Sequence, residues 1–440
     1  MGGFLNLVTQ EEISIDIHNI LRNEQFIRQC KETEVSFTRD RILTFSTLVI
    51  FIMTLLRRAL QRELVDFIDN LQSGEVDFSK VSKAAFCKAR KHLKPIAFVK
   101  LSERIIDRFY APKNDSVLLW KDYRLIAHDG STAEVPNDEK VINEWGVFKT
   151  RSDGKKICMA RLEQSYDVLN HLCLSASIDS FSVSEAQLLH RNLSEIKPIK
   201  EQDVHILDRY YASYPLIFEL TQRGDAFCFR MKKDWWKVVE QFYHSDQADQ
   251  VIALTLPEKY HQWAQEQGLD QLSLEVRLVK VELDSGEIEV LLTSLTNKNE
   301  VSLNDLKELY SLRWGVETAF SALKHKAEFE NFSGKSIQII KQDYFAKLFI
   351  LNYAAILIQP VDQLLAEKPK KKYIHQVNRN EALARLKYGV IDLFFFGNIS
   401  QALKKLTEAF KAFTEPIRPG RKYPRHKLPK RKYPRAYCHV

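Results

Sequence analysis

Cysteine is scarce, and its spacing excludes a closely spaced zinc motif. Six cysteines are scattered through 440 residues without a CxxC pair: Cys30, Cys87, Cys158, Cys173, Cys228 and Cys438. Structural zinc needs closely spaced thiolate or imidazole ligands. We expect each cysteine to be a small core residue, and the sparsity of cysteine suits a reducing cytosol.

A signal peptide and a long hydrophobic run are also missing. The first residues carry Glu11 and Glu12 and no basic segment, so we expect no signal peptide. The apolar run 42–56 would span about 22 Å as a helix, short of the roughly 30 Å hydrocarbon core of a membrane. Four arginines flank this run: Arg39, Arg41, Arg57 and Arg58. The run therefore predicts a buried helix rather than a membrane span.

Acidic residues are missing from the C-terminal segment. From Pro416 to Val440 there is no Asp or Glu, while Lys and Arg recur and the tetrapeptide KYPR occurs twice. Prolines and like charges predict a disordered tail, either a non-specific DNA contact or a solvated segment without function. The whole chain carries a net charge of +8, a mild basic bias that suggests a polyanionic partner.

What is present is the composition of a soluble globular protein. The chain is 45% hydrophobic and 28% charged, and it is long enough for two or three domains. Residues 1 to about 115 predict helices throughout. Within them, 79–95 predicts a helix with Ser79 or Ser82 as its N-cap and Pro95 as its end.

The helix expected within 79–95 is basic. Its cationic residues include Lys83, Lys88, Arg90 and Lys91. Such a helix can lie in the major groove of DNA. An ordinary solvated basic face explains the same pattern, and the sequence leaves both interpretations open.

From residue 122 onward, strands alternate with helices. The expected order is strand, hairpin, helix, strand, helix and strand. The first strand is expected over 123–130, and the hairpin over 157–166 and 171–179. The helix 183–196, the strand 203–211, the helix 214–224 and the strand 226–233 follow. The first strand ends at a predicted turn at Asp129, and the later parallel strand ends at Asp208.

A different pattern follows residue 233. Two segments, 272–283 and 288–295, predict another β-hairpin. An amphipathic helix over 308–326 and a long apolar helix over 343–358 come next. A basic linker at 368–372 and two further helices lead into the tail.

The helix expected over 308–326 carries four functional groups along one edge. At about 100° per residue, Tyr310, Arg313, Glu317 and Lys324 lie within roughly a 60° sector beside its apolar side. That apolar side is formed by Leu309, Leu312, Val316, Ala319 and Leu323. The simple interpretation is an Arg313–Glu317 pair at i,i+4, which stabilises a helix by a few tenths of a kcal/mol.

Three acids occupy positions where a ligand site can form. Asp129 and Asp208 end strands, and ligands bind at the carboxyl ends of strands in α/β sheets. With Glu317 placed over them, the acids would form an all-oxygen pocket suited to Mg²⁺ or Mn²⁺. Two such ions about 4 Å apart can activate a water or a 3′-hydroxyl and stabilise the leaving oxygen of a phosphodiester. Other acids are expected at turns and caps: Asp122, Asp179, Asp203, Asp225, Asp305 and Glu308.

These residues carry a resemblance to a known family. The spacing of Tyr310, Arg313, Glu317 and Lys324 resembles the YREK signature of cut-and-paste DDE transposases encoded by insertion sequences. The segments 126–132 and 206–211 resemble the two aspartate boxes of that family. Three neighbours also fit the signature: Trp314, Val316 and Phe320. Tyr210 departs from the pattern, because many relatives carry glycine there.

The resemblance covers roughly residues 35–360 and implies an α/β fold. It implies a ribonuclease-H-like catalytic core with a β-rich insertion, preceded by an all-α N-terminal domain. We expect a helical DNA-binding domain over 1–118 and the first part of the core over 119–233. The insertion is expected over 234–301 and the second part of the core over 302–365. A helical C-terminal region with a basic tail is expected over 366–440.

The resemblance also implies a role for each matching residue. Asp129, Asp208 and Glu317 would be the catalytic acids and would ligate the metal ions, Mg²⁺ or Mn²⁺, of which we expect two. Arg313 and Tyr310 would hold phosphates, with Lys324 as a further phosphate contact. Further DNA contacts are expected from Arg209, Trp235, Trp236, Lys83, Lys88, Arg90 and Lys91.

The tryptophans have two interpretations. Some relatives stack a flipped base on an aromatic residue of the insertion, and Trp235 and Trp236 are the candidates. Alternatively, both pack in the insertion's own core, which we expect for at least one of them.

The resulting hypothesis is a cytoplasmic, nucleoid-associated transposase that acts as a homodimer on double-stranded DNA. It would bind the inverted repeats at the element's ends, cut there and join the ends to target DNA. Two alternatives remain open. One is an inactive, domesticated DNA-binding protein of the same fold, and the other is a ribonuclease-H-like nuclease without strand transfer.

Overall fold

A single sheet runs through most of the molecule. The computed structural model describes residues 8–39, 42–54, 59–71, 81–149, 156–283, 286–367 and 372–418. The strand order is β2-β3-β1-β5-β6-β9-β8-β7, and β4 pairs with β3 beside this path. The strands are β1 (Tyr123–Val135), β2 (Phe148–Lys149), β3 (Lys156–Asp167), β4 (Leu172–Ser180), β5 (Gln202–Leu207), β6 (Ala226–Met231), β7 (Asp249–Thr255), β8 (Ser273–Glu282) and β9 (Ile288–Thr293).

Five strands form the ribonuclease-H-like α/β core that the sequence predicts. β3 runs antiparallel to both β1 and β4, whereas β1, β5 and β6 are parallel to one another. The hairpin of β3 and β4, the helix after it and the two parallel strands follow in the predicted order. The core is therefore a mixed sheet whose central strands, β1 and β5, are parallel neighbours.

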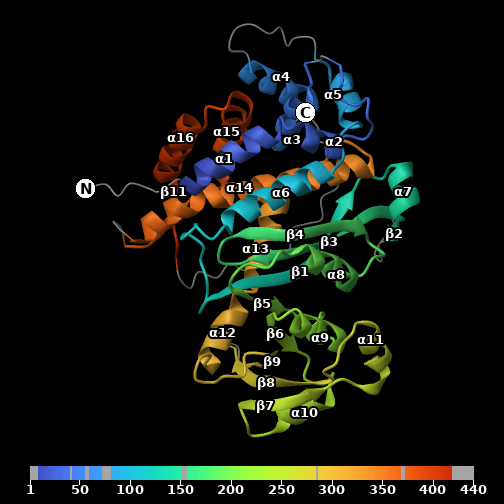
Figure 1. The fold of residues 1–440 in the computed structure, drawn as a ribbon, viewed down its shortest axis with the longest axis vertical. Helices are drawn as coiled ribbons and strands as arrows, with labels where there is room; N and C mark the ends of the chain where they lie inside the picture. The colour runs from blue at the N-terminus through green and yellow to red at the C-terminus, as the bar shows by residue number, and fades with distance from the viewer. Residues whose placement is uncertain are drawn as a thin grey trace.

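The strands of the insertion, residues 234–301, extend the core sheet. β9 pairs antiparallel with β6, so the predicted β8–β9 hairpin joins the core directly. β7, which the sequence analysis did not identify, adds to β8 at the sheet edge. In Figure 1 the sheet runs along the long axis of the molecule, from β4 in the middle to β7 at the far end.

Helices gather at the β4 end of the sheet. Among the described residues, the helices before the first strand are α1 (Val8–Ile20), α2 (Glu24–Cys30), α3 (Phe45–Met53), α4 (Leu60–Leu71), α5 (Lys83–Arg90) and α6 (Ile96–Phe109). Eight of the nine residues of α3 are buried, which confirms the predicted buried helix in the apolar run. Arg41, Arg57 and Arg58, which flank that run, lie outside the described residues.

The long helix α14 (Ile337–Glu367) forms the centre of the helical part. Among the described residues, it is the one helix long and apolar enough to cross a membrane. It packs instead against α3, α6 and β4, and 67% of its most apolar window is buried. The composition of α14 is therefore that of a core helix.

The C-terminal elements return to the N-terminal helices. They are β10 (His375–Val377), α15 (Arg379–Val390), the π-helical turn η4 (Ile391–Phe396), α16 (Ile399–Ala412) and β11 (Thr414–Pro416). Arg22 donates hydrogen bonds to the carbonyls of Phe394 and Phe395, at 3.0 and 2.8 Å. The two ends of the described chain thus pack together, as Figure 1 shows for α1, α15 and α16. The predicted basic tail lies outside the described residues from 419 onward.

Different helices cover the two faces of the core sheet. α8 (Glu185–Glu195) begins at Ser184 with a capping box and packs on β3, β4 and β1. Its Leu189 belongs to the core cluster that contains Ile126. On the other face, α13 (Trp314–Ser321) packs on β1 and β3, and its Val316 shares a cluster with Ala127. Because side chains alternate along β1, α8 and α13 lie on opposite faces.

The predicted turn after Asp129 is wrong, because β1 continues to Val135. It stays paired with β3 through this whole segment. Gly130 has a different reason to be glycine: a Cβ there would lie 2.5 Å from side-chain carbons of Glu185. The close approach of the Glu185 side chain, rather than a chain reversal, therefore favours glycine at this position, because a Cβ would force that side chain to shift.

The predicted single helix over 308–326 is interrupted. α12 (Leu303–Ser311) ends before Leu312, and α13 begins at Trp314. The last residues form a π-helical turn, η3 (Ala322–Lys326). An ideal wheel therefore does not describe the whole segment, and the four functional groups are placed by three successive elements.

Candidate active site

Asp129 and Asp208 lie at matching positions of neighbouring parallel strands. The register of β1 and β5 pairs Ala127 with Ile206, and each aspartate is the second residue after this pair. Ala127 and Ile206 face the core cluster beneath α13. Because alternate residues share a face, both aspartates belong to the side of the sheet that α13 covers.

Glu317 reaches this side of the sheet from α13, where Arg313 holds it. Nη2 of Arg313 donates a hydrogen bond to Oε1 of Glu317 at 2.8 Å. The side chain of Arg313 is 5% exposed and that of Glu317 is 37% exposed. The simple helix pair considered from the sequence does form, and it points its cation toward the acids.

Electrostatic coupling joins these groups into one site. Burial raises the pKa of Asp129 to about 6; nearby Arg313 opposes that rise, and the carboxylates of Glu317 and Asp208 add to it. Burial acts to lower the pKa of Arg313, but the hydrogen bond to Glu317 and the nearby groups of Tyr310, Asp208 and Asp129 raise it. Arg313 is thus the cation around which the three predicted acids are arranged.

Tyr310 and Lys324 border the same site. Burial raises the pKa of Tyr310, and its buried hydroxyl has no hydrogen-bond partner among the described residues. Nζ of Lys324 donates to Oγ of Ser131 at 2.6 Å and to the carbonyl of Thr132 at 2.7 Å. The π-helical turn therefore still brings Lys324 to β1, just past Asp129.

The predicted acids do not form a closed ligand set. Within the described ranges, the metal-ligating group whose donor atoms all lie within 4.8 Å is Asp203, His205 and Asp225. Both oxygens of Asp203 accept hydrogen bonds from Arg124 at 2.7 Å, and Arg223 binds Asp225 at 2.8 Å. Arginines already balance these carboxylates, so this cluster has no need of a metal ion.

The chemistry of the predicted acids nevertheless fits a divalent ion. Asp129, Asp208 and Glu317 offer only carboxylate oxygens, the donors that Mg²⁺ and Mn²⁺ prefer. The raised pKa of Asp129 shows that Arg313 alone does not offset burial and the neighbouring negative charge. Added positive charge at this position would favour the ionised form.

The basic helix is only partly available to DNA. α5 begins after its N-cap Ser82 and ends at Arg90, shorter than predicted. Lys83, Lys88 and Lys91 are exposed. Arg90 is fully buried and donates hydrogen bonds to Asp343 and Gln342, each at 2.7 Å. The prediction that Arg90 contacts DNA is therefore wrong, because its charge serves a buried ion pair between α5 and α14.

Aromatic and cationic side chains gather next to Asp208. Trp235 is 46% exposed, and Nζ of Lys232 lies 4.2 Å from its ring centroid. Tyr210 is 69% exposed, with Lys232 and half-buried Arg209 over its ring at 5.4 and 5.9 Å. Tyr210 departs from the pattern of the family that the sequence resembles, and no sequence pattern singles out Lys232.

Trp236 differs from its neighbour. Its ring stacks on Tyr214 with centroids 4.1 Å apart and an interplanar angle of 20°. Because Tyr214 belongs to α9, outside the insertion, this contact ties Trp236 to the core and leaves the expectation of packing within the insertion's own core a prediction. Trp235 is the more exposed of the pair, whereas Trp236 is half-buried.

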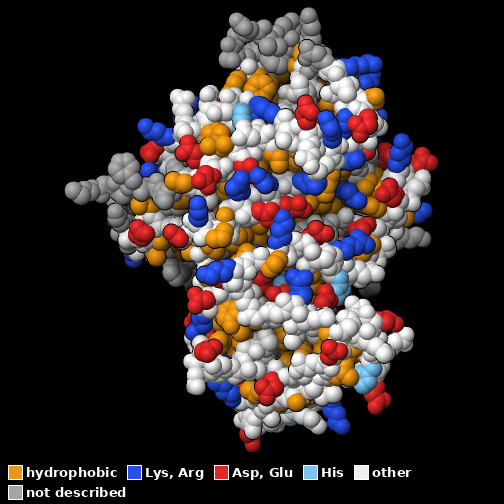
Figure 2. All heavy atoms as spheres, viewed as in Figure 1, with side chains coloured by type: hydrophobic (Ala, Val, Ile, Leu, Met, Phe, Trp, Pro, Cys, Tyr) orange, Lys and Arg blue, Asp and Glu red, His pale blue; other side chains and the backbone are white. Residues whose placement is uncertain are grey.

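The face of the molecule drawn in Figure 2 carries both signs of charge. Lys and Arg side chains are interspersed with Asp and Glu over α6 and the strands below it. A duplex needs a continuous basic surface because its phosphates repel carboxylates. This face does not present one.

The sheet order, with Asp208 directly after β5 and Asp129 at the matching position within β1, defines a ribonuclease-H-like protein with an acid-lined site. The chain belongs to the transposase DDE domain family, whose model matches residues 120–353. That range contains Asp129, Asp208 and Glu317. No curated protein matches the sequence. Among solved structures, a piggyBac transposase synaptic complex with hairpin DNA is similar at a TM-score of 0.46 and 11% identity, over 93% of this chain and 87% of that chain.

Proposed function

We propose that the chain is the DNA transposase of an insertion sequence. It binds the terminal inverted repeats of its element, hydrolyses phosphodiester bonds at the element's ends and joins those ends to target DNA. The observation that carries this proposal is the arrangement of Asp129, Asp208 and Glu317 around one buried arginine, Arg313. A protein that only bound DNA would have no use for three acids arranged around one cation.

Asp129, Asp208 and Glu317 hold the metal ions in this proposal. Two bound Mg²⁺ or Mn²⁺ ions would activate a water or a 3′-hydroxyl and stabilise the leaving oxygen. Rigid neighbouring strands fix the aspartates, whereas Glu317 is supplied by a separate helix. Arg313 exchanges its hydrogen bond from Glu317 to a phosphate of the element's end, because a guanidinium binds phosphate in the same forked geometry.

Other residues position the DNA. Lys324 contacts a phosphate beside the scissile bond, and Lys83, Lys88 and Lys91 contact the backbone of the inverted repeat, whereas the hydroxyl of Tyr310, expected to hold a phosphate, is buried. Trp235 stacks on an unpaired base near the cut, with Arg209 and Tyr210 beside it. Two chains act as a homodimer, one for each end, on the nucleoid in the cytoplasm.

The test is nicking of duplex DNA that carries the inverted repeats flanking the gene. Glu317→Gln should abolish Mg²⁺-dependent 3′-end nicking and leave end binding unchanged, because the amide keeps the shape but loses the charge. Glu308→Gln, an exposed change on α12, is the matched control and should nick as the original chain does. Nicking by the Glu317→Gln protein would overturn the proposed mechanism.

One observation favours an inactive DNA-binding protein as the second candidate. The donor atoms of the three acids do not all lie within 4.8 Å of one another, and Glu317 is paired with Arg313. An original chain that binds the repeats tightly but never nicks them in Mg²⁺ or Mn²⁺ would establish this candidate. Nicking without joining of pre-cut ends would instead identify a nuclease.

A further inference from the structure

A cavity of about 230 Å³ lies behind the helix that carries Glu317. Thr318, Ala319 and Ala322 of α13 and η3 form one wall, and α14 contributes Leu348 and Ala355. The other walls come from the β3–β4 hairpin and from the start of the C-terminal elements. Small aliphatic residues leave this space open, and a dry cavity of roughly 150 Å³ already holds a benzene molecule. The space therefore suits an organic molecule rather than water alone.

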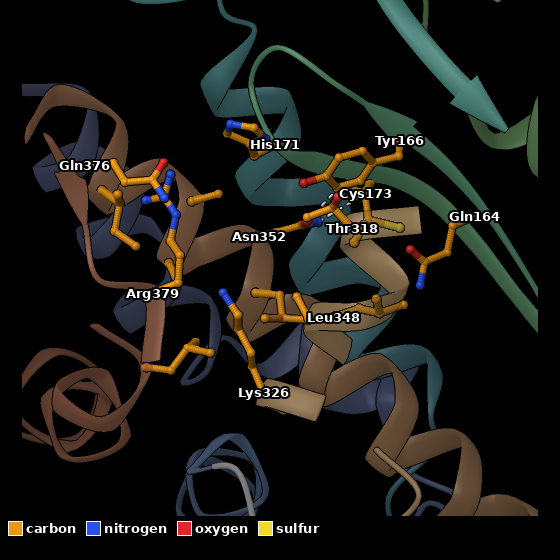
Figure 3. A pocket seen from close by; sticks show the side chains of 17 residues that line it. Gln164, Tyr166, His171, Cys173, Thr318, Lys326, Leu348, Asn352, Gln376 and Arg379 are labelled. Carbon is orange, nitrogen blue, oxygen red and sulfur yellow. Dashed lines mark hydrogen bonds between the residues drawn. The ribbon is translucent and has the colours of Figure 1, made fainter. Parts of the chain in front are cut away.

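Two cations reach this cavity, and its lining has no carboxylate. Figure 3 shows Lys326, Arg379 and His171 on one side of the space, with Gln164, Tyr166 and Cys173 on the other. None of the described residues that line it is Asp or Glu. Lys326 and Arg379 are half-buried, and a partly desolvated positive charge without a facing acid favours a partner of opposite charge.

Lys326 lacks such a partner. Within the described part of the chain, its ammonium forms no hydrogen bond or ion pair. Burial lowers the pKa of Lys326; Glu415 opposes this effect, and Arg379 adds to it. The carboxylate of Glu415 is occupied instead by Gln376, at 3.0 Å, so it does not replace a direct partner.

Arg379 has one engaged and one unengaged nitrogen. Nη2 donates to Oδ2 of Asp362 at 2.6 Å, which fixes the guanidinium. Nη1 is buried and has no hydrogen-bond partner among the described residues. A buried guanidinium nitrogen without an acceptor is costly and marks a position where an acceptor is missing.

We propose that this cavity binds a small organic anion. Its carboxylate or phosphate accepts hydrogen bonds from Nζ of Lys326 and Nη1 of Arg379, and its apolar body packs on Ala319, Ala322 and Ala355. The basic tail does not suit this space, because residues 416–440 contain no acid and their lysines and arginines would be repelled.

An anion bound in this cavity would contact α13, the helix that carries Glu317. Thr318 and Ala319 directly follow Glu317, and Lys326 belongs to the same π-helical turn as Lys324. An occupant would favour one position of α13 and η3 over others, which makes the anion an effector of the acid site.

The probe is phenyl phosphate, titrated into the full chain by calorimetry without DNA or metal ions. Phenyl phosphate should bind and raise the unfolding temperature of the protein. Inorganic phosphate and phenol, which each lack one half of the probe, should bind at least about tenfold more weakly. Benzoate tests whether a carboxylate can replace the phosphate. Lys326→Met should weaken binding about tenfold or more, because a charge-assisted hydrogen bond is lost. Lys405→Met, an exposed change on α16, should have no effect.

A second variant keeps the test decisive if Lys326→Met does not fold. Ala355→Leu fills the apolar part of the cavity and should also abolish binding of phenyl phosphate, while circular dichroism shows that the protein is folded. Failure of phenyl phosphate to bind, binding of inorganic phosphate with equal affinity, or unchanged binding by the folded variants would each overturn the proposal. These measurements use no DNA, so their failure leaves the proposed transposase function unaffected.

Discussion

Arg313 and Glu317 share a hydrogen bond of 2.8 Å, and the guanidinium that donates it is almost fully buried beside Asp129 and Asp208. A pair that sequence alone explains as ordinary helix stabilisation is thus placed inside a cluster of acids. Its position gives the arginine two competing roles, as the internal counterion of the acids and as a ligand for an incoming phosphate.

Replacing Arg313 should affect metal and DNA binding in opposite directions. Arg313→Gln removes a positive charge from beside the carboxylates, so Mn²⁺ should bind more tightly, on the order of tenfold. Affinity for the element's end should fall, because a forked phosphate contact is lost. Calorimetry with Mn²⁺ and fluorescence anisotropy with labelled DNA measure the two effects. Lys307→Gln, an exposed change on α12, is the control, and parallel losses of both affinities would contradict the two roles.

Asp129 should destabilise the metal-free protein at neutral pH. Its pKa is about 6 in the folded chain, against 3.8 in the unfolded one, so between these values the folded state binds more protons. The contribution of Asp129 to stability therefore falls as pH rises through this window and stays low above it. Asp129→Asn should raise the unfolding temperature without metal at pH 7.5.

The effect of Asp129→Asn should be much smaller at pH 3.5, where Asp129 is protonated in the folded chain and mostly protonated in the unfolded chain as well. Differential scanning calorimetry in chelator at the two pH values measures it. An equal shift at both values would show that packing, rather than ionisation, is responsible.

Lys88 and Arg90 of α5 should separate stability from DNA binding. Arg90→Met leaves Asp343 buried without its partner and should lower the free energy of unfolding by about 3–5 kcal/mol. Lys88→Met should leave stability nearly unchanged, yet reduce the salt dependence of DNA binding by about one phosphate contact. Urea denaturation measures the stability of each variant, and DNA binding at several salt concentrations measures its phosphate contacts. A weakly destabilised Arg90→Met protein with reduced DNA binding would restore the original prediction for Arg90.

The neighbouring tryptophans should also respond differently. Trp236→Ala removes the ring that stacks on Tyr214 and should destabilise the chain by about 1 kcal/mol or more. Trp235→Ala should be nearly neutral for stability, but it should weaken binding of an end with an unpaired base about tenfold. Fluorescence of 2-aminopurine placed at the cut reports the stacking, and quenching that survives Trp235→Ala would exclude this residue.

Much of the fold follows from local patterns. The β3–β4 hairpin, the amphipathic helix that forms α8 and the buried helix in 42–56 each depend on neighbours in sequence, and the sequence predicts each of them. The five described cysteines are free thiols, four of them buried, as their scatter indicated.

The features that sequence did not predict depend on distant contacts. β1 passes through Asp129 and Gly130 because β3 pairs with it and Glu185 approaches Gly130. Arg90 looks like a surface cation until Asp343, far along the chain, is placed against it. β9 extends the core sheet only because the edge of β6 is available for pairing. Likewise, nothing local distinguishes Lys326 from other lysines, and only the fold places it in a cavity.

Metal binding to the acid site tests the central claim most directly. Mn²⁺ binding to the full chain should be measured by electron paramagnetic resonance for the original chain and for Asp129→Asn, Asp208→Asn and Glu317→Gln, with exposed Asp234→Asn as the control. The account predicts that each of the three variants loses bound Mn²⁺ while the control retains it. Full Mn²⁺ binding by all three variants would contradict it.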